Sequence, residues 1–465
     1  MTPTDATFLA TAPTLRVRDL LARAEAALVR PVDIAWLAAF RVLFGLAMAV
    51  SMQRFVAYGW IDSLLVGPKM RFHYWGFGWV EPLSRGGMHV LFYVLVGLAL
   101  AMAAGLAFRV TAPLFALGLT YVQLIDVSTY LNHYYLAGLL AWLLALSPAN
   151  GAWSVDAWAT KERRDHVPTA WLALFRVQIG LVYVFAGLAK LQSDWLLHGQ
   201  PLGIWLGANT DLPVLGRLFT VAGAPLVMSW FGFFFDVSIV GWLSWRKTRP
   251  YAYAVLLVFH VLTRMLFDIG MFPLIMSIAA LVFFDPSWAR FGRTRAPTPP
   301  TARRSRWVRA ALAVGSVYCI LQVFLPLRAH LYGGNVLWHE QGMRFSWRVM
   351  VRAKGGATTF LVRTASGRVI HVEPSTYLTA FQENEMSGQP DLVLQLAHRI
   401  QRDFEARGQG PVEVRAESYA SLDGRPAALL IDPDVDLTQV HDGIAPARWI
   451  RPAPSDPPPP TRPVR

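Results

Sequence analysis

Long apolar runs, repeated through residue 330, constrain this chain more than any other feature. A membrane span needs roughly twenty mostly apolar residues to cross the hydrocarbon core. Nine candidate runs cover residues 34–53, 88–107, 110–128, 133–148, 170–190, 224–245, 251–267, 270–285 and 307–327. The fourth, seventh and eighth are short, and 202–222 is ambiguous, with a re-entrant or interfacial segment as one interpretation. The pattern predicts a polytopic α-helical membrane domain over residues 1–330 with about nine spans.

Composition supports this class and argues against a soluble nucleic-acid-binding protein. The chain is 54% hydrophobic and 16% charged, whereas a soluble protein carries about a quarter charged residues. The net charge of +13 comes mostly from short loops between apolar runs, so the positive-inside rule explains it without a nucleic-acid partner. The single cysteine, Cys319, excludes an intramolecular disulfide and a cysteine-based zinc site.

The basic residues also predict an orientation. With the N-terminus inside, most of them fall in inner segments, including Arg163, Arg164, Arg246, Lys247 and the Pro/Arg-rich linker 286–306. The chain lacks an apolar signal-peptide region before residue 30, so the first span is expected to act as the insertion signal. Compact loops and scarce cysteine favour a bacterial cytoplasmic (inner) membrane, with the C-terminal domain outside.

The pattern changes after residue 330. Runs typical of strands cover 345–354, 358–364, 368–372, 412–422 and 425–431, and an amphipathic helix is predicted over 392–407. Residues 331–452 are therefore expected to form a small, β-rich α+β domain on the extracytoplasmic side. The Pro-rich tail 453–465 is expected to be disordered.

Polar side chains at membrane depth indicate a site, because each is unfavourable there without a reason. With the predicted orientation, five such residues fall at one outer level: Asn132, His133, Lys190, His260 and Arg264. Each also has an ordinary explanation: a lysine at a span end extends to the headgroups, and a lone histidine packs and hydrogen-bonds. Asp194 and Asp236 are expected to be structural. The histidines do not show metal-ligand spacing, so no metal site is predicted.

At these positions the sequence resembles the vitamin K-dependent γ-glutamyl carboxylases and their bacterial relatives. The resemblance covers most of the chain and rests on the order and spacing of many short motifs. They are Phe40-Arg41, Asn132-His133, Trp153-Ser-Val-Asp156, Arg163-Arg164, His166-Val-Pro168, Ala186-Gly-Leu-Ala-Lys190-Leu, Asp194-Trp195, Phe259-His260, Ile269-Gly-Met-Phe272, Phe345-Ser-Trp347 and Asp432-Pro-Asp-Val-Asp436.

The resemblance implies an activity and a set of roles. The family oxidises reduced vitamin K with O₂ to the epoxide and uses that energy to remove a γ-proton from a protein glutamate, and the carbanion then captures CO₂. By position, Lys190 matches the catalytic base, and His133 with Asn132 matches the group that stabilises the oxygenated quinone. His260, Arg264 and Trp195 are the predicted cofactor-binding residues. A Glu-containing protein, a lipid-soluble quinone and membrane lipids are the implied partners.

Elementary chemistry is compatible with these roles. A lysine amine is a base only when neutral, a form that desolvation and nearby positive charge favour. A glutamate γ-carbon is too weak an acid for any side chain, so the strong base must come from the cofactor in a dry pocket.

The chain also departs from the animal members of the family. Ala189 replaces a second lysine, Gly342-Met343-Arg344 replaces tyrosines, and the disulfide-forming cysteines are absent. Two alternatives therefore stay open: a quinol epoxidase without glutamate carboxylation, and a non-enzymatic quinone- or lipid-binding or transport protein.

Overall fold

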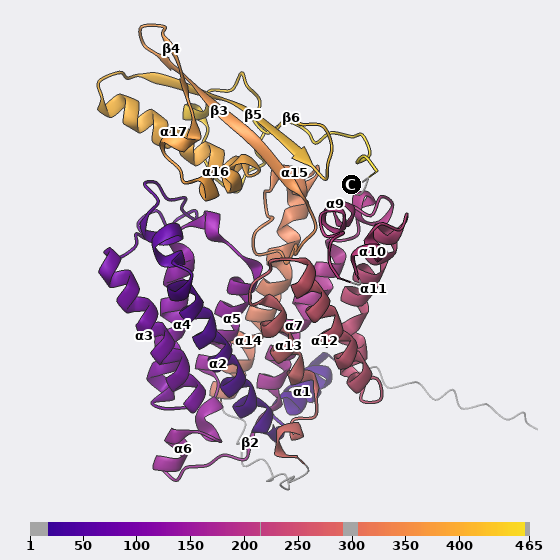
Figure 1. Cartoon of the computed structure of the whole chain (residues 1–465). Coiled ribbons are helices and arrows are strands. Elements are labelled where there is room, and N and C mark those ends of the chain that lie inside the picture. The colour runs from indigo at the N-terminus through magenta and orange to yellow at the C-terminus, as the bar shows by residue number, and fades with distance from the viewer. Residues whose placement is uncertain (1–16, 214, 292–305, 461–465) are drawn as a thin grey trace, which may run out of the picture.

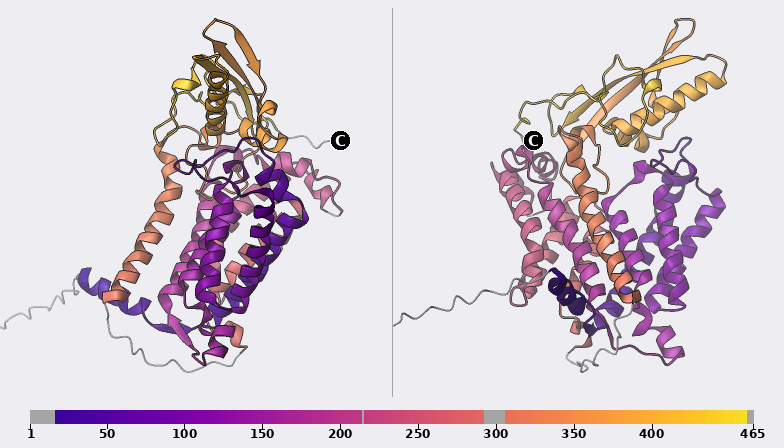
Figure 2. Two further views of the ribbon diagram at one scale, coloured as in Figure 1. Left: turned by 90° about the vertical axis from the view of Figure 1, so that its left-hand side faces the viewer. Right: turned by 180° about the vertical axis from the view of Figure 1, so that it is seen from behind.

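A bundle of long helices carries a small sheet domain at one end (Figure 1). The computed structural model describes residues 17–213, 215–291 and 306–460. Helices stand side by side through the bundle, and the sheet domain caps the end where α14 finishes (Figure 1 and Figure 2). The bundle helices are α2 (Ala35–Ala57), α3 (Arg85–Ala104), α4 (Phe108–Leu124), α5 (Asn132–Leu146), α7 (Thr169–Leu188), α11 (Ala224–Ser244), α12 (Arg249–Leu266), α13 (Phe272–Ala280) and α14 (Arg306–Leu327).

Every predicted span coincides with one of these helices, but the count of nine membrane crossings is not confirmed. Five helical segments are long and apolar enough to cross a membrane: Ala35–Ala57, Arg85–Ala104, Thr169–Leu188, Ala224–Ser244 and Arg306–Leu331. The others are shorter or less apolar. For example, the 15 residues of α5 extend only about 22 Å, against a hydrocarbon core of about 30 Å.

The lipid-facing and core-facing sides of the bundle differ clearly. Helix α14 leaves Val314, Val317, Ile320, Leu321 and Phe324 exposed, as a helix facing lipid does. Helix α2 is largely buried and packs against α3 at Gly45, where an added Cβ would lie 2.7 Å from the Ala103 Cβ. Together with the five long apolar helices, these faces support an integral membrane protein.

Short elements cover the two ends of the bundle. At the end away from the sheet domain lie α1 (Val17–Leu28), α6 (Val155–Ala159) and a two-stranded ribbon of β1 (Pro31–Asp33) and β2 (His166–Pro168) (Figure 1). At the sheet-domain end, the ambiguous segment 202–222 contains α9 (Leu202–Gly207) and α10 (Gly216–Phe219), and α8 (Ser193–Leu196) precedes them.

The C-terminal domain is an antiparallel sheet covered by two helices. Its strand order is β4 (Val369–Val372), β3 (Lys354–Thr364), β5 (Val412–Leu422) and β6 (Ala428–Leu429). Burial alternates along β5 because one face of the sheet packs against α17 (Pro390–Ala406). Helix α16 (Ala380–Ser387), which we did not predict, begins with a capping box of Thr379 and Gln382. The helix α15 (Val336–His339) joins this domain to α14.

One predicted strand is wrong. Residues 345–353 are irregular, because Phe345, Trp347 and Met350 have positive φ angles of 62°, 57° and 50°, which no strand contains. Their aromatic side chains pack downward onto the bundle instead, with Trp347 stacked on Tyr135 at 4.9 Å. In the Pro-rich tail, the described residues 453–460 contain no helix or strand, and the Pro459 carbonyl accepts a hydrogen bond from Gln200.

Candidate active site

Lys190 lies two residues beyond the end of α7 and is buried against α11. Its Nζ donates to the Asp236 Oδ2 at 2.6 Å and to the Ala186 carbonyl at 3.2 Å. Gly187 permits this contact, since an added Cβ there would lie 2.6 Å from the Val237 side chain. The small residue lets the two helices approach closely, and the next helical turn then brings the amine to the carboxylate.

Trp195 covers the Lys190 amine. Its ring centroid is 5.1 Å from Nζ, a cation–π distance, and its Nε1 donates to the Ser229 carbonyl at 2.8 Å. Trp195 is 3% exposed, so it closes this side of the amine against water.

His260 extends the cluster toward the middle of the bundle. Its Nε2 lies 3.1 Å from the Tyr183 hydroxyl, while its Nδ1 is buried with no hydrogen-bond partner in the described part of the chain. Tyr183 is two helical turns before Lys190 and packs on Phe235, the neighbour of Asp236, with ring centroids 6.1 Å apart. The His260–Tyr183 pair and the Lys190–Asp236 pair are therefore contiguous.

His133 joins the same cluster through Phe272. The Phe272 ring centroid lies 6.4 Å from that of His133 and 6.4 Å from that of His260. Gly270, with a φ of 57°, packs over His133, since an added Cβ would lie 3.6 Å from the imidazole. Residues from four helices, α5, α7, α12 and α13, thus meet with Asp236 of α11 in one buried aromatic and polar cluster.

The other predicted site residues lie at its margins. The Asn132 Oδ1 accepts from the Tyr130 hydroxyl at 3.0 Å, and that hydroxyl accepts from the Phe345 N–H at 2.8 Å, so Asn132 connects to the C-terminal domain. The Arg264 side chain is 53% exposed and lies 3.9 Å from Asp268. In the described structure the charged partner of Lys190 is Asp236, whereas Arg264 makes no ion pair or hydrogen bond with Lys190.

A second buried ion pair, beside Trp195, joins the two domains. Both nitrogens of the Arg425 fork reach Asp194, at 2.6 and 2.7 Å. Although burial opposes it, the Arg425 guanidinium holds the pKa of Asp194 below its ordinary value. Burial and the neighbouring Asp194 charge raise the pKa of Asp423 to about 7, and its Oδ2 has no donor among the described residues.

A cleft of about 530 Å³ is lined by residues of both the C-terminal domain and the bundle. Arg328 lines this cleft and has no acidic partner in the described residues. Its guanidinium donates to the Leu325 and Arg344 carbonyls at 2.6 and 2.5 Å. The cleft is lined mainly by residues from the loop before α3, the end of α14, α17 and the C-terminal loop, including His73, Tyr74, Trp75, Arg328, His339, Arg344, Phe345, Asp391, His441 and Asp442.

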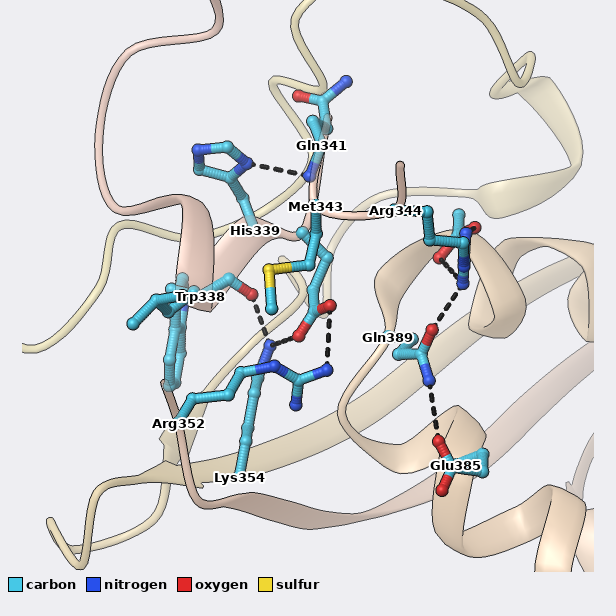
Figure 3. A network of polar contacts seen from close by, with 12 residues as sticks. Trp338, His339, Gln341, Met343, Arg344, Arg352, Lys354, Glu385 and Gln389 are labelled. Carbon is cyan, nitrogen blue, oxygen red and sulfur yellow. Dashed lines mark hydrogen bonds and ion pairs between the residues drawn. The ribbon is translucent and has the colours of Figure 1, made fainter. Parts of the chain in front are cut away.

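Two polar networks fix the wall of this cleft (Figure 3). In one, Arg344 donates to Asp391 at 2.6 Å and to Gln389, which in turn donates to Glu385 at 3.1 Å. In the other, the buried Lys354 amine contacts the Trp338 carbonyl and the Glu340 carboxylate. Burial lowers the pKa of Lys354 to about 8.

Sequence reasoning missed Asp236 and Tyr183 as members of the cluster. Both carried a signal: an acidic residue inside an apolar run needs a partner, and Tyr183 shares a helix face with Lys190 at a spacing of seven. Arg425 had no such signal, because its partner lies 231 residues away. Among the described residues, no group of three or more His, Cys, Asp or Glu side chains could hold a metal ion.

Comparison with known families matches this architecture in two parts. Residues 29–288 match the model of the HTTM domain. Residues 307–456 match the lumenal domain of vitamin K-dependent gamma-carboxylase. The chain belongs to the vitamin K-dependent γ-glutamyl carboxylase family. This membership supports a carboxylase-like function and the use of reduced vitamin K. No solved structure matches the chain.

Proposed function

We propose that this family member couples O₂-dependent epoxidation of a reduced naphthoquinone to carboxylation of glutamate side chains in a protein, giving γ-carboxyglutamate. The observation that carries the proposal is the buried Lys190 amine, hydrogen-bonded to Asp236 at 2.6 Å and contiguous with His260 and His133. A buried lysine at a helix end with a single carboxylate partner is the kind of group that serves as a base.

The cluster suits a flat aromatic ring with polar edges. The unpartnered Nδ1 of His260 is a buried polar atom that a quinol oxygen would satisfy, and Phe272 supplies a ring face beside both histidines. In this proposal His133 and His260 hold the reduced quinone, Trp195 covers the Lys190 amine, and Asn132 and Arg264 lie at the margins. When bound with O₂, the quinol supplies the strong base that no side chain provides at neutral pH.

Lys190 and Asp236 are proposed to prepare the base. Transfer of one proton from Nζ to Oδ2 along their hydrogen bond converts an ammonium–carboxylate pair into an amine and a carboxylic acid without changing the net charge. A low-dielectric interior favours the neutral pair relative to water, because it removes the need to solvate two ions. The neutral Lys190 amine can then accept the proton of a quinol hydroxyl.

Exclusion of water supports the same proposal. Lys190, Asp236, His260 and His133 are each no more than 7% exposed, and Trp195 covers the amine. Solvent protons would quench a strong base, so a dry cluster is required before a γ-proton can be removed from glutamate.

The interdomain cleft is the proposed place for the glutamate-containing peptide. Phe345 lines it, and the Phe345 N–H donates to the Tyr130 hydroxyl, which in turn donates to Asn132. Arg328 offers a guanidinium without an acidic partner in the described residues. Arginine binds carboxylates with well-defined geometry, so Arg328 is a proposed anchor for an acidic peptide.

The decisive experiment incubates the purified protein with reduced vitamin K and O₂, with and without a glutamate peptide and labelled bicarbonate. Epoxide is followed by chromatography, and label is measured in the peptide. The proposal expects both products. Epoxide without label would select the quinol epoxidase alternative, and no epoxide under any condition would favour a binding or transport protein.

A further inference from the structure

Several of the sequence motifs lie far from the candidate active site. The segment between α5 and α7 carries Trp153-Ser154-Val155-Asp156 and Arg163-Arg164. It includes α6 and β2, which lie at the end of the bundle opposite the sheet domain (Figure 1). The proposed epoxidation and carboxylation use none of these residues.

Buried polar contacts hold this segment in a fixed shape. The guanidinium of Arg41, fully buried in α2, donates to the carbonyls of Ala103, Ala149, Ala152 and Trp153 at 2.5–3.2 Å. The Asp156 carboxylate accepts from the N–H groups of Ala107 and Phe108 at 2.7 and 2.9 Å, and so caps α4. The loop is therefore anchored before any ligand arrives.

This fixed loop forms one wall of a cleft of about 430 Å³ that is rich in arginine. Arg290 lines it and pairs with Asp33 at 2.6 Å, while its Nη2 is buried without a hydrogen bond and lies 3.6 Å from Asp165. Arg163 and Arg164 are exposed, and neither has an ion pair within the described ranges. Arg164 is held in place by its backbone N–H, which donates to the Gly151 carbonyl at 2.8 Å.

Apart from Ser154 and Asp165, the rest of the lining is apolar, and its two tryptophans are open to the surroundings. Trp153 and Trp158 line the cleft and are 48% and 72% exposed, beside Ala152 and Val155. Exposed tryptophans next to arginines at the end of apolar helices are typical of the membrane interface, where rings lie at the level of the headgroups. The lining thus combines guanidinium donors for an anion with an apolar surface for a hydrocarbon chain.

We propose that this cleft binds the phosphate of an anionic phospholipid headgroup, from the leaflet at the end of the bundle opposite the C-terminal domain. Arg163 and Arg164 bind the phosphate oxygens, since guanidinium forks match phosphate geometry, and Arg290 extends the positive wall. Trp153 and Trp158 contact the glycerol and the first acyl carbons. Nonspecific attraction of basic loops to the membrane surface would need no such cleft.

The test titrates the detergent-solubilised full chain with phosphatidylglycerol or phosphatidylcholine, and native mass spectrometry counts bound lipid. The double variant Arg163→Gln/Arg164→Gln is compared with Arg246→Gln/Lys247→Gln, which removes the same charge from an exposed loop outside the cleft. Phosphatidylglycerol binding should weaken at least about tenfold in the first variant, because charge-assisted hydrogen bonds to the phosphate are lost, and less than about twofold in the second.

Three outcomes would overturn the proposal. Equal losses in the two variants would mean that only surface charge matters. Equal binding of phosphatidylcholine would remove the requirement for an anionic headgroup. Displacement of the lipid by millimolar inorganic phosphate would make the cleft a free-phosphate site. Thermal unfolding of both variants checks that the fold is retained.

Discussion

Two buried ion pairs lie beside Trp195, and they are built differently. Lys190 meets Asp236 through one hydrogen bond of 2.6 Å inside the helical bundle. Arg425 meets Asp194 through two, at 2.6 and 2.7 Å, and joins the C-terminal domain to the segment after α7. One pair can exchange a proton, whereas the other contains a guanidinium that stays charged.

The two ion pairs therefore suit different roles, one in the proposed reaction and one in positioning the two domains. A lysine amine is a point charge that can become a base when it loses its proton, so its pair with Asp236 is suited to reaction. The bidentate Arg425–Asp194 pair fixes geometry and cannot serve as a base. Trp195 follows Asp194 directly and covers Lys190, so the interdomain pair holds the cover of the amine.

The largest expected effect comes from breaking the Lys190–Asp236 pair. Lys190→Ala should lower epoxide formation by at least about a hundredfold, because general bases contribute about 10²–10⁴-fold. Lys190→Arg should be as inactive, although it keeps the charge, because a guanidinium does not deprotonate. Chromatography of the epoxide measures both, and Lys247→Ala, an exposed lysine, is the matched control.

Stability distinguishes a lost base from a misfolded protein. Lys190→Ala leaves the Asp236 carboxylate buried and unpaired, which should cost about 3–5 kcal/mol. The double variant Lys190→Ala/Asp236→Asn removes that charge and should recover much of the thermal stability but none of the activity. Normal turnover in either Lys190 variant would refute its assignment as the base.

Breaking the Arg425–Asp194 pair should affect stability more than chemistry. Arg425→Gln leaves Asp194 buried without its guanidinium, and we expect a loss of about 3 kcal/mol with only a partial loss of epoxide formation. Arg415→Gln, which removes a more exposed arginine of β5, should cost less than about 1 kcal/mol. Thermal unfolding and limited proteolysis between the domains measure the difference; equal stability of Arg425→Gln and Arg415→Gln would contradict it.

The comparison also shows which structural features the sequence could predict. Apolar run length located all nine bundle helices, and alternation located β5 at Val412–Leu422, since both signals are local. Lys190, His260 and His133 were expected at one level, and the structure brings them into one contiguous cluster. Arg425 and Asp194 could not be paired, because their contact depends on how two domains pack. The irregular segment at Phe345 was missed for the same reason.

Asp423 gives the interdomain junction a pH dependence. Its pKa is raised to about 7, above an unfolded value of about 3.9, so the folded state binds the extra proton. The contribution of Asp423 to stability should therefore be full below about pH 4, decline as the pH rises to about 7, and stay level above it.

The variant Asp423→Asn tests whether Asp423 causes stability to decline as the pH rises. Asparagine keeps the Oδ1 that accepts the Ala353 N–H at 2.8 Å and tolerates the φ of 54°. Between pH 4 and 7, the free energy of unfolding should fall by at least about 1.4 kcal/mol more in the unmodified protein than in the variant, which is the equivalent of one pKa unit. Thermal unfolding across that range measures it, and an unchanged slope would show that Asp423 is not the titrating group.

The smallest expected effect comes from changing Trp195, which lies between the two ion pairs in the chain of contacts that links Asp194 to Lys190. Trp195→Phe keeps a ring over Lys190 but loses the hydrogen bond to the Ser229 carbonyl, which should cost about 1 kcal/mol. If Trp195 acts only as a cover, epoxide formation should fall a few-fold and both ion pairs should remain intact. Trp242→Phe, at a half-exposed position of α11, should change neither property. A loss of epoxide formation as large as that of Lys190→Ala would instead place Trp195 among the groups that contact the quinone. Another ring can replace a cover over the amine, but it cannot replace a surface that binds the quinone.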